Sequence, residues 1–420
     1  MVEYTRRIGL SLGADICWPI CYEALLRDLD LTIRDGNDLI RFEVDRVSIE
    51  PFSLSQPVRY DVVIDRLTHW YHVSREWIKK SIVHDDLYVF NNPFSLTSME
   101  KHTSYAAMMR LGFPVPETWM LPPKSYAESD DLEPTLRQYA KLFDLKAIGE
   151  RIGFPMFMKP YDGGAWVGVT QLKDAEALSA AYEESGTRVM HLQKAASPHD
   201  LFVRCVGLGP QTRHVNYDPG APLHDRYRME TDFIDAADRQ RLSDMTLVIN
   251  AFFGWDFNSC EALRVHGMWH PIDFANACPD SQVTSLHYHF PWLIKANLRW
   301  SIYCAATRRR MRTDFNWRDY FDIAAEDRPF DEKLAAYVEI ARERMSVDDF
   351  ESFCDTHLSD LDERANAFFG TETVRDAIGQ LSERRELPNH PYDQRLGAEG
   401  LPAAGAKNRP AYESLIRQKA

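Results

Sequence analysis

The chain has 420 residues, and at roughly 150 residues per domain this length predicts two or three packed units. Apolar residues make up 45% and charged residues 27%, a balance typical of a globular chain with a sizeable core. The 49 Lys and Arg are outnumbered by 63 Asp and Glu, so the surface disfavours nucleic acid and anionic lipid as partners. Apolar runs fall short of the ~18–20 residues that span a bilayer, and we expect a cytoplasmic protein without membrane contact.

The N-terminal part alternates strand-like and helix-like patterns. Short apolar runs such as IGLSLG, RYDVVIDRL and DLYVF are separated by a helical pattern through Tyr22, Leu25 and Leu29. Cys17 and Cys21 are one helical turn apart and are expected in the core as reduced thiols. This pattern predicts an N-terminal α/β domain over residues 1–95.

The middle of the chain mixes helices, strands and glycine-rich turns, and this predicts an α+β unit over residues 96–298. A capping box at Thr97 and Glu100 predicts a helix over 98–111 that ends at Gly112. The remaining elements are expected in chain order as a helix over 135–152, a strand–turn–strand over 153–172, a helix over 174–186, strands over 188–193 and 200–206, a polar loop over 208–230, a helix over 235–252, and a hairpin that turns at His266 and Gly267.

The C-terminal part has few glycines and a helical apolar period through residues such as Leu334, Tyr337 and Phe350. It predicts a helical extension over 299–385. Residues 386–420 are rich in Gly, Pro and Ala, which is typical of an extended or flexible tail. The basic cluster at 308–312 is expected to be a solvated face of a helix.

Two places carry residues suited to phosphate and metal chemistry. In MFMKPYDGGAWVGV, Lys159 ends an apolar strand just before a glycine turn, so lysine and backbone amides can meet a polyphosphate. Glu261 and Asp273 lie on the two strands of the expected hairpin, with Asn276 just beyond, and such oxygen ligands suit Mg²⁺. The simpler alternatives are a lysine that extends into solvent and two unrelated acids on a solvated face.

Taken together, these segments resemble the ATP-grasp superfamily, as in glutathione synthetases, D-alanine–D-alanine ligases and ribosomal-protein glutamate ligases. The similar segments are NNPFSLTSMEKHTSYAAMMRLGFPVPET, IGFPMFMKPYDGGAWVGV, HLQKAASPHDLFVRCVGLG and FFGWDFNSCEAL followed by HPIDFANACPD, over about 190 residues. The resemblance implies an ATP-grasp domain of two lobes with a hinge near 194–197, preceded by a pre-ATP-grasp α/β domain. It also implies ATP as cofactor, with Mg²⁺ or Mn²⁺.

The resemblance assigns a role to each matching residue. It implies nucleotide-binding roles for Lys101, Lys159, Gly163, Gly164, Gly168, Gln193, Lys194, Ala195 and Asp200, and metal-binding roles for Glu261, Asp273 and Asn276.

The chain departs from the usual pattern at two points. Asn276 comes one residue late after Asp273, so it points away from the metal unless a bulge restores it, and Asp280 is the alternative ligand. Gln193 stands where an acid is common, which leaves the mode of adenine binding open.

Arginines near the predicted site are candidates to neutralise the transferred phosphate or bind an anionic substrate. Arg213, Arg226 and Arg228 lie in the expected loop over 208–230, and Arg204 lies on the preceding strand. We expect Arg226 or Arg228 first. The alternative for each of these arginines is that it is simply exposed to solvent in a basic loop.

The resemblance implies an ATP-dependent carboxylate–amine ligase that forms an amide or peptide bond through an acyl phosphate and releases ADP and phosphate. The expected partners are small carboxylate and amine substrates, such as an amino acid or peptide, and a second copy of the chain in a homodimer. Two alternatives stay open: a kinase that phosphorylates a small alcohol, and a nucleotide-binding protein without catalysis.

Overall fold

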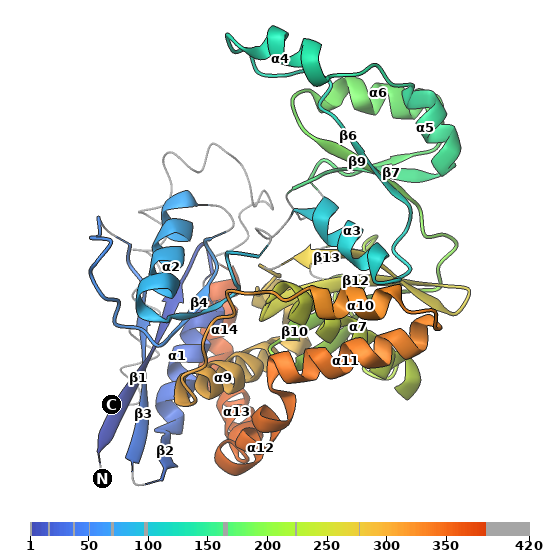
Figure 1. Ribbon diagram of the computed structural model, residues 1–420. Coiled ribbons are helices and arrows are strands. Elements are labelled where there is room, and N and C mark those ends of the chain that lie inside the picture. The colour runs from blue at the N-terminus through green and yellow to red at the C-terminus, as the bar shows by residue number, and fades with distance from the viewer. Residues whose placement is uncertain are drawn as a thin grey trace.

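The computed structural model describes residues 2–383, apart from 16, 37, 50, 69–70, 96–99, 163–166, 223–224 and 277. It contains three sheets, which lie in the N-terminal part, in a small upper lobe and in the centre of the body (Figure 1). Thr97 of the expected capping box, Gly163, Gly164 and the tail over 386–420 lie outside the described residues. In the part of the chain that the structure covers, every helix is too short or too polar to cross a bilayer.

The first sheet has the order β2-β3-β1-β4-β5, in which only β2 runs antiparallel to its neighbour. Its strands and helices are β1 Glu3–Ser11, α1 Cys17–Leu29, β2 Thr32–Asp35, β3 Asp38–Arg46, β4 Val62–Asp65, α2 His72–Asp85 and β5 Tyr88–Phe90. Helix α1 buries Cys17 and Cys21 against one sheet face, and α2 packs Trp77 and Ile78 against Val63 on the other. The alternation of strands and helices was therefore interpreted correctly.

The small lobe is an antiparallel sheet in the order β6-β9-β7-β8 with helices on its outer side (Figure 1). Its elements are β6 Thr118–Leu121, α4 Leu132–Tyr139, α5 Leu145–Ile152, β7 Met156–Pro160, β8 Thr170–Leu172, α6 Ala175–Ser185 and β9 Met190–Lys194. The single helix expected over 135–152 was wrong. The Asp144 side chain accepts a hydrogen bond from the Ala147 amide and starts a new helix, so α4 and α5 are separate.

The central sheet is antiparallel in the order β11-β10-β12-β13. Its elements are β10 Leu201–Leu208, β11 Gln211–Asn216, α7 Ala236–Phe253, β12 Phe257–Val265 and β13 Met268–Asn276. The hairpin turn at His266 and Gly267 is confirmed, since both residues have positive φ. The loop expected over 208–230 was wrong in part, because β11 is a strand of mostly polar residues that hydropathy alone does not reveal.

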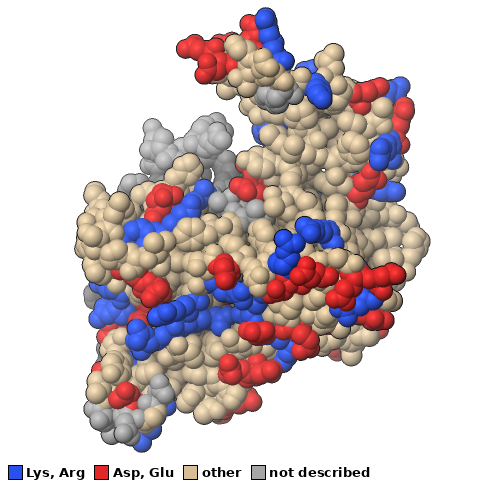
Figure 2. Space-filling view, viewed as in Figure 1, with Lys and Arg blue, Asp and Glu red and all other residues tan. Residues whose placement is uncertain are grey.

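The helical C-terminal region is confirmed. Its helices are α8 Val283–Leu286, α9 Phe290–Ala306, α10 Arg318–Ala325, α11 Phe330–Met345, α12 Val347–His357, α13 Leu361–Gly370 and α14 Glu372–Glu383. Helix α9 passes through the limit expected at residue 298, so the helical region begins earlier. Acidic side chains gather over α10 and α11 on the face shown in Figure 2, and a band of Lys and Arg side chains lies beside them.

The expected basic helix face at 308–312 was wrong in part: Arg308, Arg310 and Arg312 are exposed, but they do not lie on a helix. Helix α9 ends at Ala306, and Arg309 turns inward to donate hydrogen bonds to Tyr88 Oη at 3.0 Å and Ser346 Oγ at 2.8 Å. Tyr88 and Trp300 both donate to the buried Asp256 carboxylate, at 2.6 and 2.7 Å. A buried polar network thus connects the first sheet, the central sheet and the helical region.

Candidate functional site

The front face of the central sheet brings together the two predicted metal carboxylates. Glu261 on β12 lies opposite Asp273 on β13 and opposite Arg204 on β10. Residues directly opposite in antiparallel strands place their side chains on the same face, so all three side chains share it. The other face is covered by α7, whose Asn250 accepts a hydrogen bond from Asn258 of β12.

Lys101 reaches this face from the first residue of α3 (Lys101–Arg110), which lies between the small lobe and the body (Figure 1). Its Nζ lies 2.6 Å from both Oδ1 and Oδ2 of Asp273, and the residue is only 4% exposed. Its backbone amide donates to the Tyr161 carbonyl just beyond β7. Burial alone would raise the pKa of Asp273, but Lys101 and the charge of Lys159 hold it below its usual range.

Lys159 lies on β7 on the side of the small lobe that faces the site. Its Nζ donates to Gln193 Oε1 at 2.7 Å, and Gln193 Nε2 donates to Thr118 Oγ1 at 3.1 Å. Burial lowers the pKa of Lys159 to about 8; the charge of Asp273 raises it and that of Lys101 lowers it. Because Gln193 on β9 is neutral, it does not neutralise the positive charge of Lys159, which can therefore bind an anion.

Arg204 is the predicted arginine that joins the carboxylates. Its guanidinium donates to Glu261 and to the Tyr227 hydroxyl, and it stacks 4.4 Å from the centre of the Tyr217 ring. The two tyrosines and Glu261 hold the cation in one orientation. The sequence analysis placed Arg204 on a strand, but its position opposite Glu261 follows from the pairing of β10 with β12.

The other three predicted arginines make their described contacts elsewhere. Arg228 pairs with Asp218 at 2.7 Å, and Arg226 Nε donates to the Ala221 carbonyl, so both are held within their own segment. Arg213 lies on the same sheet face as Arg204 but donates to His289 Nδ1 at 3.1 Å. The preference for Arg226 or Arg228 over Arg204 is therefore not supported by this geometry.

Asn276 reaches Asp273 because β13 is irregular. The register shifts twice around Glu261, and each shift adds a residue to β13, which is the bulge that the sequence required. Asn276 Nδ2 lies 3.2 Å from Asp273 Oδ1 and 3.2 Å from the Ser259 carbonyl. Asp280, the alternative ligand, accepts a hydrogen bond from the Gln282 amide in the following loop.

The predicted hinge residues stand apart from the carboxylates. The amides of Lys194 and Ala195 donate to the carbonyls of Glu117 and Pro155, so they connect β9 to the start of the small lobe. Asp200 forms an ion pair with Arg264 at 2.7 Å at the far end of β12. Of the glycine turn, Gly168 is described, and its φ of 75° is one that favours glycine.

Two buried residues near the site had no role in the sequence analysis. Arg66 at the end of β4 donates to the Pro279 carbonyl at 2.8 Å and pairs with Asp15 at 3.3 Å. His191 is the cross-strand partner of Lys159, and among the described residues neither of its ring nitrogens has a hydrogen-bond partner. Strand alternation in RVMHLQ predicts that His191 shares a face with Gln193, whereas no local signal connects Arg66 with Pro279.

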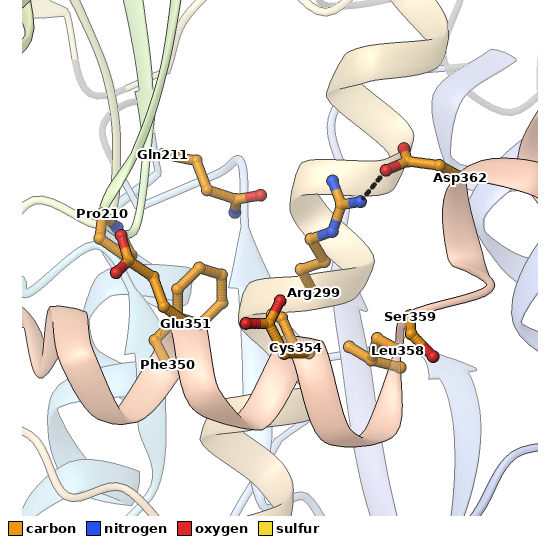
Figure 3. Close-up of a pocket in the computed structure, with 10 residues that line it drawn as sticks. Pro210, Gln211, Arg299, Phe350, Glu351, Cys354, Leu358, Ser359 and Asp362 are labelled. Carbon is orange, nitrogen blue, oxygen red and sulfur yellow. Dashed lines mark hydrogen bonds and ion pairs between the residues drawn. The ribbon is translucent and has the colours of Figure 1, made fainter.

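A cavity of about 390 Å³ lies away from these residues (Figure 3). It is lined by the β10–β11 turn, α9 and α12, and Arg299 donates to Asp362 at its edge at 2.7 Å. The predicted site residues are absent from its lining, and Glu351 and Asp355 make it acidic. It is therefore not the predicted nucleotide site.

Comparisons with known proteins bear on the fold of the chain. No protein-family model matches the chain. A D-alanine–D-alanine ligase of Neisseria gonorrhoeae is 34% identical over 99 residues, which are 24% of this chain and 25% of that protein. The match thus spans about a quarter of the length of this curated relative.

Among solved structures, the D-alanine–D-alanine ligase of Bacillus anthracis matches 72% of this chain and 98% of its own, with a TM-score of 0.50 and 15% identity. A RimK domain ATP-grasp protein of Sphaerobacter thermophilus matches 65% of this chain and 92% of its own, with a TM-score of 0.44 and 15% identity. The chain has the ATP-grasp fold, with a helical region added at its C-terminal side. The resemblance of the four sequence segments is confirmed at the level of the fold.

Proposed function

We propose that this protein is an ATP-dependent ligase that joins a carboxylate to an amine through an acyl phosphate. The observation that carries the proposal is the convergence of Lys101 and Lys159 with Glu261 and Asp273. These residues come from α3, the small lobe and the central sheet, which are remote in sequence. The partial similarity to a D-alanine–D-alanine ligase supports the same class of reaction.

The donor set fits a hard divalent cation. Glu261 and Asp273 offer carboxylate oxygens, and Asn276 would present its amide oxygen after a half-turn of the amide group. Clusters of three or more His, Cys, Asp or Glu suited to a metal are absent from the described residues. Water and phosphate oxygens would therefore complete the coordination, as is usual for Mg²⁺.

The cationic side chains fit a triphosphate. Lys159 would leave Gln193 and Lys101 would leave Asp273 to bind phosphate oxygens, and Arg204 would face the transferred group from the central sheet. Bound Mg²⁺ would supply further positive charge against the charge that develops during phosphoryl transfer. The arrangement stabilises the transition state through fixed charges rather than through a nucleophile of the protein.

The substrates proposed are small: an amino acid or peptide carboxylate and an amine. The carboxyl end of the first sheet supplies a wall of the site, because Arg66, which pairs with Asp15, donates to the Pro279 carbonyl after β13. In open α/β sheets ligands bind at the carboxyl ends of the strands, where the chain connections diverge from a central strand. Strand β1 is that central strand, with β3 on one side and β4 on the other.

A thermal-unfolding titration with Mg²⁺ and ATP tests the nucleotide site. A ligand that binds only the folded chain raises the unfolding midpoint, and we expect a rise in the parent that Lys159→Ala and Asp273→Asn abolish. Acid and amine pairs are then screened for ADP release. Free phosphate beside an amide product supports the ligase, whereas phosphate retained on an alcohol product would make the protein a kinase.

A further inference from the structure

Each of the two carboxylates proposed to bind the metal already forms an ion pair with a basic side chain of the protein. Lys101 Nζ contacts both oxygens of Asp273 at 2.6 Å, and Arg204 is bonded to Glu261. Lys101 is 4% exposed and Glu261 is 6% exposed, so solvent screens these ion pairs weakly. Each carboxylate is thus neutralised by the protein before any ligand binds.

A divalent cation and Lys101 compete for the same atoms. Mg²⁺ binds carboxylate oxygens at about 2.0–2.1 Å in a nearly regular octahedron, and the ammonium group on both oxygens of Asp273 opposes it through charge repulsion and by occupying lone pairs. Displacing Lys101 without giving it a new anion would leave a buried charge unpaired, and that is strongly unfavourable. The triphosphate of a nucleotide is an anion that can take over this lysine.

We propose that Lys101 couples metal binding to nucleotide binding. It occupies Asp273 while phosphate is absent and frees the carboxylate when phosphate oxygens bind the ammonium group. This inference rests on the proposed nucleotide site. Since coupling between two ligands is reciprocal, each must raise the affinity for the other by the same factor.

Lys159 provides a matched control within the same site. It is also a cation directed at the proposed phosphates, but its Nζ is held by the neutral Gln193 amide. Releasing Lys159 to a phosphate frees no carboxylate. Its removal should weaken nucleotide binding and, because Lys159 acts on Asp273 through its charge without contacting it, should raise the affinity for metal alone much less than the removal of Lys101 does.

The test is a calorimetric titration of Mn²⁺ into the parent, Lys101→Met and Lys159→Met in the absence of nucleotide. Lys101→Met should bind Mn²⁺ more tightly than the parent, by about 5–150-fold if the coupling has the usual size, whereas Lys159→Met should change the Mn²⁺ affinity much less. In a second titration, with ADP in the presence of Mn²⁺, both variants should bind more weakly. If Lys101 had only a structural role, its substitution would weaken the binding of both ligands. It would not strengthen Mn²⁺ binding while it weakens ADP binding.

Lys101→Arg keeps the positive charge and should keep the Mn²⁺ affinity as low as in the parent. If Lys101→Met does not fold by circular dichroism, Lys101→Gln takes its place in the same titration. Unchanged or weaker Mn²⁺ binding in a folded, uncharged variant would overturn the inference. Failure of the parent to bind ADP or ATP would instead refute the proposed function, while the Mn²⁺ titration would still decide whether Lys101 blocks Asp273.

Discussion

The body and the small lobe differ in how their cores are built. One continuous core contains residues of the first sheet, the central sheet and the C-terminal helices, for example Ile8, Val203 and Trp300. The small lobe has a core of its own, which includes Met158 and Leu192. The helical region is therefore part of the body that carries the carboxylates, whereas the lobe that carries Lys159 is packed as a separate unit.

Because of this difference, one part of the site is held rigidly and another part can move relative to it. Glu261 and Asp273 are fixed by paired strands within the large core. Lys159 belongs to the separate core, and α3 connects the two: its Tyr105 hydroxyl donates to the Ile272 carbonyl of β13 while its ring packs against His191 of β9. Regions with few shared buried contacts open more readily than a common core.

The largest effect is expected from Trp300→Ala in the body. Trp300 is fully buried on α9 and donates to Asp256, so its removal should lower the free energy of unfolding by about 3–5 kcal/mol. Denaturant unfolding followed by circular dichroism measures this loss over the whole body. Leu54→Ala, at a residue that is 73% exposed, is the control, and an equal loss there would contradict the account.

A smaller and local effect is expected from Leu192→Ala. This residue is fully buried in the core of the small lobe, and the lost packing costs about 2–5 kcal/mol. Amide hydrogen exchange should accelerate in β6, β7 and β9 and stay unchanged in β10 and β12. Met120→Ala, in the same lobe but 62% exposed, should leave exchange unaltered. Acceleration throughout the body would show that the two cores unfold together.

The buried Asp256 should make the stability of the body depend on pH. Burial raises the pKa of Asp256 from 3.8 to about 6, so the folded chain binds this proton at a pH where the unfolded chain has lost it. This contribution to stability is present below the unfolded pKa and is lost as pH rises through about 6. The parent should therefore lose stability relative to Asp256→Asn between pH 4 and pH 7, and denaturant unfolding at both pH values measures the difference.

The smallest effect concerns nucleotide affinity. The pKa of Lys159 is about 8, so its charge is present below that pH and lost above it. Affinity for the nucleotide should fall as pH rises from 7 to 9, by at most about tenfold per pH unit. Lys159→Arg stays charged and should flatten this dependence in a calorimetric titration. The same slope in both proteins would assign the pH effect to another group.

The sequence by itself determined the N-terminal α/β unit, the helical C-terminal region and the hairpin that carries Glu261 and Asp273. Alternating apolar runs predicted the first α/β unit, and helical periodicity predicted the C-terminal helices. The spacing of Glu261 and Asp273 around a tight turn predicted one carboxylate on each strand of a hairpin. These features depend on local spacing, which a single sequence contains.

Only the tertiary structure decided which charges meet. Lys101 and Asp273 are 172 residues apart, and Arg309 and Tyr88 are 221 apart, so no local pattern predicts either contact. The bulge that brings Asn276 to Asp273 depends on strand pairing, and the choice of Arg204 over Arg226 and Arg228 depends on which side chains the core encloses. Long-range packing selects among charged residues that are equivalent in sequence, because the cost of burial is offset only where an opposite charge lies within reach.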